Sequence, residues 1–203
     1  MKYITHDHRY AQNLFETDTE FTSLYNEVID VISSISDEEL IKNYQMNERE
    51  NKKSLSETIN KLIYEKLTRK EWTAESAIFS DPSYANGKDK KRWRVDFAKD
   101  KITIEVAFNH GEAIAWNLIK PVLASELNHV AKEIQSSAGI IVCATDEMKK
   151  AGNFDSAVGS YEKFLRYLKP LQNILTTPIL IIGLLPPDSF YINKYTKQVV
   201  VKE

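Results

Sequence analysis

Two apolar runs in the second half of the chain constrain its fold more than any other feature. Ala138–Ala144 and Pro178–Leu184 consist mainly of aliphatic and small side chains, and a segment with helical spacing near Ser160–Leu175 lies between them. Strands with continuous apolar runs are typically buried on both faces, and a strand, a helix and a strand in this order are usually parallel neighbours. The pattern therefore predicts a parallel strand pair in a sheet that helices cover on both sides.

A second pattern, further upstream, predicts an antiparallel hairpin. The runs Arg94–Ala98 and Ile102–Phe108 alternate apolar and polar residues, and only Lys99-Asp100-Lys101 separates them. Such alternation around a short polar turn is typical of two paired strands. The apolar side chains of the second strand share one face, so Glu105 points away from the most apolar face.

Helical spacing of apolar residues dominates the rest of the chain. It predicts an acidic amphipathic helix within residues 1–50, with Asp18 or Thr19 as its N-cap, and a helix from about Leu55 to Arg69. It also predicts a helix over 112–135, which Pro121 kinks or interrupts. The sequence shows no repeat and no linker, so we expect a single α/β domain over residues 1–203.

Charge is unevenly distributed, although the formal net charge is only −2. Residues 1–50 hold four basic and eleven acidic residues, whereas residues 86–101 hold seven basic and three acidic ones. Binding to a phosphate backbone requires concentrated positive charge. The basic stretch from Lys88 to Arg94 is therefore either part of a DNA-binding surface or an ordinary solvated loop, and the charge pattern leaves both open.

The sequence also indicates a compartment. The single cysteine, Cys143, lies in an apolar run and cannot form an internal disulfide. The first residues lack the apolar core of a signal peptide, and no stretch approaches the roughly 18 apolar residues of a membrane span. We therefore expect a cytoplasmic protein.

The common catalytic motifs are missing from this sequence, including Gly-rich phosphate loops, Gly-x-Ser-x-Gly, paired cysteines and His-Glu-x-x-His. The remaining candidates are two carboxylates, Asp96 and Glu105, on adjacent strands of the predicted hairpin. Paired carboxylates are costly unless a cation joins them, and Mg²⁺ prefers such hard oxygen ligands. The pair predicts either a magnesium site or an edge hairpin with two solvated acids.

The hairpin segment Asp96-Phe97-Ala98-Lys99-Asp100-Lys101-Ile102-Thr103-Ile104-Glu105-Val106 resembles a known active site. It is similar to the catalytic hairpin of type II restriction endonucleases of the BglII/BamHI group, a branch of the Asp…(Asp/Glu)-x-Lys nuclease superfamily. The spacing of the acids and the Glu-Val-x-Phe ending fit the BglII side of that group. Weaker similarities extend the resemblance over about residues 55–187, and they lie at Asn60–Leu67 with Trp72, at Gly159–Glu162 and at Pro178–Leu184.

This resemblance implies a fold and an activity. The fold would be a mixed sheet flanked by helices, with residues 55–187 as the nuclease core and residues 1–50 as an acidic helical addition. The activity would be Mg²⁺-dependent, site-specific hydrolysis of double-stranded palindromic DNA by a homodimer, leaving 5′ overhangs, with a GATC core among the candidate targets. A DNA methyltransferase acting on the same site would protect the host DNA.

The resemblance also implies roles for individual residues, by matching position. Asp96 and Glu105 would be the catalytic acids and, with the backbone carbonyl of Val106, the metal ligands, while Asn60 would lie beside the reacting groups. The residues expected to contact DNA are Asn109 and His110 after the second strand, Asn153 and Ser156 in the loop Asn153–Gly159, and Lys91, Arg92 and Arg94 in the basic stretch.

One position departs from the family pattern. Two residues after the glutamate, the family has Gln, Glu or Lys, which helps to orient or activate the attacking water, whereas this chain has Ala107. Either the site is impaired or another group projects into this space, and the candidates are Glu57, Lys99, Asn109, His110 and Glu112. Two rival functions therefore stay open: a structure-specific or repair nuclease on the same fold, and a DNA-binding protein that does not cleave.

Overall fold

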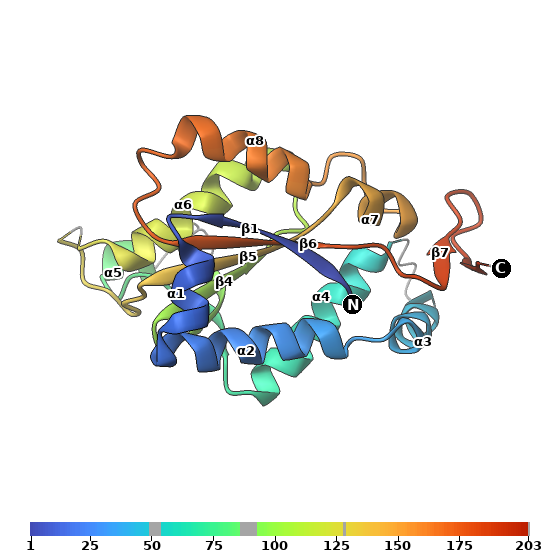
Figure 1. Cartoon of the computed structure of the whole chain (residues 1–203), viewed down its shortest axis with the longest axis horizontal. Helices are drawn as coiled ribbons and strands as arrows, with labels where there is room; N and C mark the ends of the chain where they lie inside the picture. Colours follow the sequence, from blue (N-terminus) through green and yellow to red (C-terminus); the bar gives the residue numbers. More distant parts are fainter. Residues whose placement is uncertain (49–53, 86–92, 128, 203) are drawn as a thin grey trace.

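The computed structural model of the protein describes residues 1–48, 54–85, 93–127 and 129–202, and a six-stranded mixed sheet forms its centre (Figure 1). The strands of this sheet are β1 (Tyr3–His8), β2 (Thr73–Ala77), β3 (Arg94–Lys99), β4 (Ile102–Val106), β5 (Ala138–Ala144) and β6 (Ile179–Leu184). Their order is β1-β6-β5-β4-β3-β2. The neighbours β4, β5 and β6 run parallel, and the pairs β1–β6, β3–β4 and β2–β3 are antiparallel.

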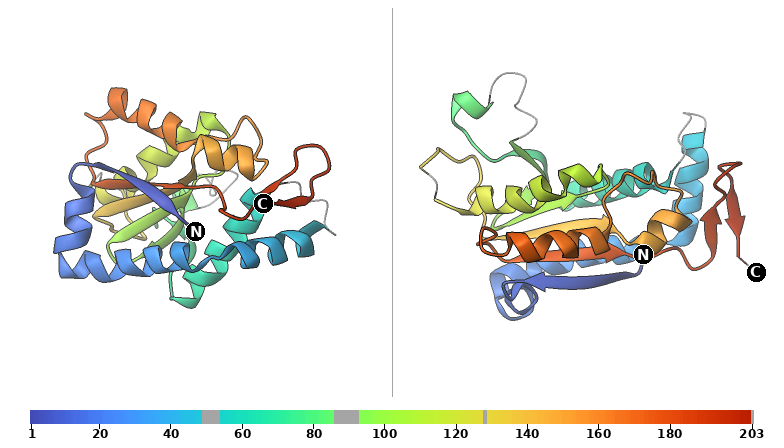
Figure 2. Two further views of the ribbon diagram at one scale, coloured as in Figure 1. Left: turned by 45° about the vertical axis from the view of Figure 1, so that its right-hand side comes forward. Right: turned by 90° about the horizontal axis from the view of Figure 1, so that it is seen from above.

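Helices cover both faces of this sheet, as Figures 1 and 2 show. The helices are α1 (Ala11–Thr17), α2 (Thr19–Ser34), α3 (Asp37–Glu48), α4 (Leu55–Arg69), α5 (Pro82–Ala85), the 3₁₀ helix η1 (Gly111–Ala113), α6 (Ile114–Ser125), α7 (Asp146–Ala151) and α8 (Tyr161–Leu171). A separate two-stranded sheet of β7 (Phe190–Ile192) and β8 (Val199–Val201) follows the last long strand. No helix in the described ranges is both long enough and apolar enough to cross a membrane. The expected α/β fold with a mixed sheet between helices is confirmed.

The two apolar runs form the central parallel pair that the sequence predicts. Every residue of β5 and of β6 is buried, and the register runs from Gly139 opposite Ile179 to Ala144 opposite Leu184. Helix α8 lies between these strands in the sequence and packs on one face of the sheet (Figure 1). Because both faces of the sheet are covered, the side chains that point to either face of these strands are apolar.

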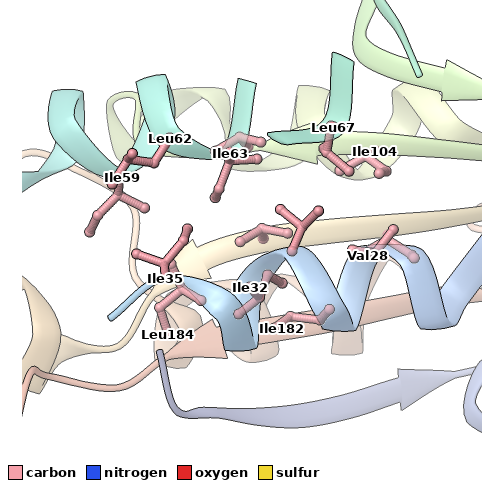
Figure 3. Packing of buried hydrophobic residues seen from close by; sticks show 14 of the residues in the cluster. Val28, Ile32, Ile35, Ile59, Leu62, Ile63, Leu67, Ile104, Ile182 and Leu184 are labelled. Atoms are coloured by element: carbon pink, nitrogen blue, oxygen red, sulfur yellow. The ribbon is translucent and has the colours of Figure 1, made fainter. Parts of the chain in front are cut away.

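The hydrophobic core has a layer on each side of the sheet. On one side, Val28 and Ile32 of α2 and Ile63 of α4 face Ile104 of β4 and other buried strand residues (Figure 3). On the other side, α6 and α8 cover the opposite faces of the same strands. Each fully buried aliphatic side chain contributes about 1.5–3 kcal/mol of transfer free energy relative to an exposed one. Because the two layers lie on opposite faces of the sheet, successive side chains of β4 point alternately into one and the other.

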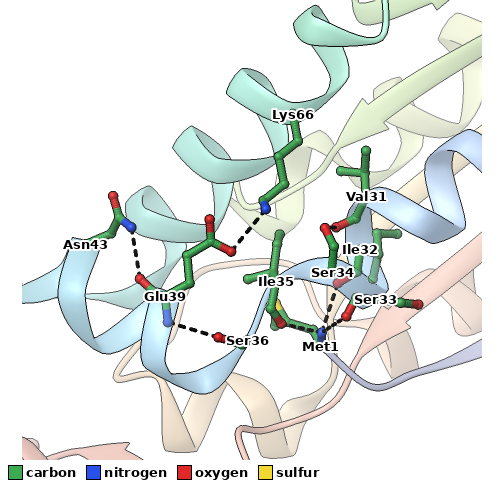
Figure 4. A network of polar contacts seen from close by, with 10 residues as sticks. All are labelled: Met1, Val31, Ile32, Ser33, Ser34, Ile35, Ser36, Glu39, Asn43 and Lys66. Atoms are coloured by element: carbon green, nitrogen blue, oxygen red, sulfur yellow. Dashed lines mark hydrogen bonds and ion pairs between the residues drawn. The ribbon is translucent and has the colours of Figure 1, made fainter.

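Polar contacts fix the N-terminal helices. The carboxylate of Asp18 accepts a hydrogen bond from the backbone N–H of Glu20. Asp18 is therefore the N-cap of α2, and it is one of the two residues, Asp18 and Thr19, that the sequence predicted for this position. The amino group of Met1 donates to the carbonyl of Ile32 at 2.9 Å, where the carbonyls at the helix end lack intrahelical partners (Figure 4). Lys66 of α4 pairs with Glu39 of α3 at 3.1 Å and joins these two helices.

The helix expected over residues 112–135 is only half correct. Helix α6 contains Pro121 but ends at Ser125. In the segment that follows, the N–H of Ser80 donates to the carbonyl of Ala131 at 2.9 Å, and the N–H of Glu133 donates to the carbonyl of Ile78 at 3.0 Å. The segment after α6 therefore packs beside residues 78–80. The helical spacing of its apolar residues led to a wrong prediction of helix here.

Candidate active site

The predicted hairpin brings Asp96 and Glu105 together. Phe97 of β3 pairs with Ile104 of β4, which places Asp96 and Glu105 at the next opposed position of the two strands. Oδ2 of Asp96 accepts a hydrogen bond of 2.6 Å from the backbone N–H of Val106. The Asp96 side chain thus accepts a hydrogen bond from the backbone of the neighbouring strand, next to the last regular backbone pairs of the hairpin. This contact fixes the carboxylate beside Glu105.

Glu105 is among the most buried charged residues that the structure describes, with 1% of its surface exposed. Its Oε2 atom forms an ion pair with the ammonium group of Lys120, which reaches across from α6. Its Oε1 atom is also buried and has no hydrogen-bond partner among the described residues. A buried carboxylate oxygen without a partner is costly, so this atom is suited to accept a ligand.

Lys120 is brought to Glu105 by the close packing of α6 on the sheet. A Cβ atom on Gly139 of β5 would lie 2.6 Å from the Cβ atom of Pro121, so only glycine allows the helix to approach here. Gly139 is the partner of Thr103 on β4, two residues before Glu105 and on the same face. The sequence analysis did not identify Lys120, although Asn117 and Lys120 are two polar residues one turn apart on the buried face of an apolar helix.

The environment raises the pKa of both carboxyl groups. For Glu105, burial is the largest cause and the nearby charge of Asp96 adds to it, while Lys120 acts in the opposite direction, and the pKa lies well above the ordinary value. For Asp96, burial again raises the pKa, against the opposing effects of Lys120 and of the Val106 N–H group. Removal of water thus favours the neutral forms, and an additional cation at this position would favour the ionised ones.

The donor set fits a hard divalent cation. Two opposed carboxylates, with Oε1 of Glu105 unpartnered, are oxygen ligands of the kind that Mg²⁺ takes. A carbonyl oxygen has two lone pairs, and that of Val106 accepts a hydrogen bond from the N–H of Phe108 at 3.1 Å. Within the described residues there is no cluster of three or more His, Cys, Asp or Glu side chains, so water and substrate oxygens would complete the coordination of a cation here.

A small cavity lies at the end of β4, on the α4 side. It has a volume of about 250 Å³, and Glu57, Asn60, Val106 and Asn109 are among its lining residues. The structure thus brings Glu57 and Asn60 of α4 to the same cavity as Val106. Asp96 and Glu105 do not line this cavity, so Val106 is the residue common to the carboxylate pair and the cavity.

The residues after β4 contact the predicted recognition loop. His110 forms an isolated β-bridge with Val158, and the N–H of Gly159 donates to the carbonyl of Asn109 at 3.0 Å. Lys149 supports the loop from the other side, since its ammonium group donates to the carbonyl of Val158 at 2.5 Å. Two of the segments expected to contact DNA are therefore joined by backbone hydrogen bonds.

Other expected residues lie elsewhere. Arg94 begins β3 and is half-buried, whereas Lys91 and Arg92 fall outside the described residues. Lys99 cannot replace the missing side chain at position 107, because its ammonium group binds both carboxylate oxygens of Glu27 at 2.9 and 3.0 Å.

Ala107 itself is buried against α6. It shares a hydrophobic cluster with Ile114 and Leu118, and only 1% of its surface is exposed. Of the basic side chains in the described ranges, Lys120 is the one that forms an ion pair with Glu105. It was absent from the candidates that the sequence suggested for the space beside Ala107.

A mixed sheet between helices, with opposed carboxylates on a β-hairpin, fits the fold and the hairpin that the sequence resemblance to restriction endonucleases implies. The family model described as "Restriction endonuclease BglII/BglIII" matches residues 3–184. The chain belongs to this family of restriction endonucleases, which hydrolyse phosphodiester bonds of DNA.

Solved structures support the same fold. The chain is similar to restriction endonuclease BglII in complex with a DNA 16-mer, with a TM-score of 0.66 and 17% identity over 100% of this chain and 89% of that one. It is also similar to free BglII, with a TM-score of 0.56 and 15% identity over 100% of this chain and 91% of that one. No curated protein sequence gives a significant match.

Proposed function

We propose that the protein is a Mg²⁺-dependent type II restriction endonuclease that cuts double-stranded palindromic DNA as a homodimer in the cytoplasm. The observation that carries this proposal is the opposed pair Asp96 and Glu105, with a buried carboxylate oxygen that lacks a partner. A cognate DNA methyltransferase would act on the same site. A short palindrome cut with 5′ overhangs, with a GATC core as one candidate, follows from the family resemblance.

The metal would be held by Asp96, Glu105 and the carbonyl of Val106. Mg²⁺ bound there would polarise the scissile phosphodiester and lower the pKa of an attacking water. The chain's own contribution is placement: the Val106 N–H group donates a hydrogen bond of 2.6 Å to the Asp96 carboxylate, and the surrounding side chains bury Glu105. The amide of Asn60, which lines the cavity beside Val106, can donate to and accept from a phosphate or a water.

The DNA-binding surface is proposed to include a larger basic cleft next to this cavity. The cleft has a volume of about 1000 Å³, and the predicted residues Asn153 and Ser156 lie in its wall. Five lysines but only two carboxylates line it; the lysines are Lys149, Lys150, Lys194, Lys197 and Lys202, and the acids are Glu147 and Asp155. Ser54 lines the cleft and Ser56 lines the smaller cavity, so the start of α4 borders both.

This arrangement suits a duplex that lies across both cavities. Lysines position a phosphate backbone without reading sequence, whereas the side chains of Asn153 and Ser156 can form hydrogen bonds with base edges. His110 is bridged to the same loop, so a base contact there is coupled through the backbone to the end of β4. Recognition and cleavage would thus share one segment of the chain.

Incubation of purified protein with plasmid DNA and Mg²⁺ tests the proposed function. We expect discrete fragments with identical ends, and the Glu105→Ala variant should cut at least about 10³-fold more slowly, because a metal ligand is lost. That variant should still bind the cognate fragment in Ca²⁺, and Glu133→Ala, an exposed acid outside the site, should cut like the wild type. End-sequencing of the fragments would give the site and the stagger.

The same experiment separates the rival functions. Unspecific or junction-specific nicking would contradict site-specific restriction and support a repair nuclease. A mobility shift without cleavage at any divalent metal would support a DNA-binding protein that does not cleave, which the buried Ala107 favours. Cleavage by Glu105→Ala at the wild-type rate would contradict the assignment of the metal site.

Removal of the lysines from the cleft should weaken DNA binding in a salt-dependent way. Lys150, Lys194 and Lys197 form no ion pair with another described residue. Each phosphate contact adds about 0.9 to the slope of log affinity against log salt, so the triple alanine variant should lower this slope by up to about 2.7. Fluorescence anisotropy in Ca²⁺ measures it.

The control for the lysine variants is a pair of exposed helical lysines away from the cleft. Lys42→Ala on α3 and Lys169→Ala on α8 each remove one positive charge, two in all against three in the cleft variant, and together should leave the slope within about half a unit of the wild type. An equal loss of affinity in the control and in the cleft variant would mean that the cleft has no special part in binding DNA.

A further inference from the structure

The strongest unexplained feature of the molecule is the buried ammonium group of Lys120. Its side chain is only 10% exposed and lies on a face of α6 that is otherwise largely apolar. Its partner, Glu105, belongs to the carboxylate pair, and its charge also acts on Asp96. Lys120 is therefore part of the charge balance of the candidate metal site, although it comes from a different element of the fold.

Stability alone is a poor explanation for this ion pair. The desolvation of two charges often exceeds their attraction, and apolar side chains of similar size frequently serve a core equally well. The pair is also incomplete, because Lys120 contacts Oε2 of Glu105 and leaves Oε1 buried without a partner. A scaffold pair would gain from a partner for both oxygens, whereas a ligand site needs one of them free.

The packing of α6 fixes the ammonium group on this side of Glu105. Pro121, the next residue, lies against Gly139 so closely that a side chain there would clash with it. Ile114 and Leu118 of the same helix cover Ala107, the position that follows Glu105 on the same strand face. The helix that covers this position with apolar side chains is therefore the one that also supplies the ammonium group, two residues after Leu118.

We propose that Lys120 is a positioning residue of the metal centre: its ammonium group holds Oε2 of Glu105 and leaves Oε1 as the atom that binds a divalent cation. This inference rests on the proposed function, because it assigns the cation to the same carboxylate pair. The ammonium group of Lys120 would lie beside the cation, so it restrains the carboxylate and at the same time limits how tightly the cation binds. The lysine thus lowers the affinity for the cation and at the same time fixes the orientation of the buried Glu105 carboxylate.

The test combines metal binding with cleavage in the Lys120→Met variant. Electron paramagnetic resonance counts free Mn²⁺ in the DNA-free protein, and the variant should bind Mn²⁺ about tenfold more tightly, because a like charge near the cation is removed. Single-turnover cleavage at saturating Mg²⁺ should nevertheless fall about 10²-fold, because the orientation of Glu105 is lost. Tighter binding with slower chemistry is a combination that mere loss of packing would not produce.

Further variants keep the test decisive. Lys120→Arg retains the charge and should recover about tenfold of the lost rate and weaken Mn²⁺ binding again. Lys120→Gln can still donate a hydrogen bond to Oε2, and it is measured in the same way if Lys120→Met does not fold. Lys42→Met, the same change on the exposed side of α3, should leave both quantities unchanged.

Several results would overturn the inference. These are unchanged cleavage in Lys120→Met, weaker Mn²⁺ binding that parallels a lower melting temperature, or no Mn²⁺ binding by the wild type at millimolar concentrations. If the wild type binds Mn²⁺ but cuts no DNA, the proposed function fails, and the Mn²⁺ affinities of the variants still decide the role of Lys120.

Discussion

The Asp96→Asn variant should lose DNA cleavage almost completely while keeping its fold. We expect the single-turnover rate to fall by about 10³-fold or more, which corresponds to roughly 4 kcal/mol of transition-state stabilisation. Asparagine has nearly the same shape, and its amide oxygen can still accept the hydrogen bond that Val106 donates to Asp96 at 2.6 Å. The variant therefore removes the charge at this site with little effect on the backbone of the hairpin.

The same variant should bind DNA at least as well as the wild type. Removal of a negative charge near the path of the phosphates lowers repulsion, so the affinity without metal should rise by about two- to tenfold. Asp96→Ala, which also loses the contact with Val106, should lower the melting temperature as well. Comparable cleavage by the wild type and Asp96→Asn, measured with the same cognate duplex, would rule out Asp96 as a metal ligand.

The part of the fold that could be predicted depends on patterns that are local in the chain. The alternation around Lys99-Asp100-Lys101 was sufficient for the hairpin, because a register is set by a short turn and a period of two. The apolar runs predicted β5 and β6, since strands buried on both faces need no alternation. In contrast, β1 lies at the sheet edge, with polar residues such as Thr5 and His6 exposed, and has no such pattern.

The same limit explains what the sequence revealed about the site. Asp96 and Glu105 are nine positions apart in one hairpin, so their meeting follows from local geometry. Lys120 reaches them through the packing of α6 against Gly139, a tertiary contact that no spacing encodes. The bridge between His110 and Val158 likewise depends on how two distant loops meet. The sequence thus predicted the pair of opposed carboxylates, and the structure adds the ammonium group of Lys120 that forms an ion pair with one of them.

The surroundings of Asp96 and Glu105 make ionisation of the two carboxyl groups costly, and they leave Oε1 of Glu105 without a hydrogen-bond partner among the described residues. Burial is the largest cause of the raised pKa of both carboxyl groups, and the exposed Glu75 adds to the effect on Asp96. One lysine offsets this cost only in part. A divalent cation at the proposed site would favour both ionised forms.

Metal binding should accordingly depend steeply on pH. Both carboxyl groups must release their protons to bind a cation, and their raised pKa values move this requirement toward neutral pH. As the pH falls through those values, the apparent Mn²⁺ affinity should drop by between about tenfold and about a hundredfold per pH unit, depending on whether one or two protons are taken up. A titration from about pH 5 to about pH 9 measures this slope.

Stability of the metal-free protein should change in the opposite direction. Because the folded-state pKa values are raised, the native protein binds more protons than the unfolded chain between the ordinary and the raised values. The contribution of these two groups to stability is therefore lost as the pH rises through this window and regained as the pH falls. Glu105→Gln, which carries a neutral side chain at every pH, should gain stability relative to the metal-free wild type as the pH rises.

The two pH dependences can be tested on one set of samples. Thermal unfolding with and without Mg²⁺ should show little stabilisation by metal at low pH and increasing stabilisation above the raised pKa values, because protons and metal compete for the same oxygens. Glu105→Gln should lower the pH slope of Mn²⁺ binding by about one proton. Glu133→Gln, an exposed control, should leave the slope unchanged. A Mn²⁺ affinity that stays constant over the whole titration would show that the cation does not bind to the buried pair.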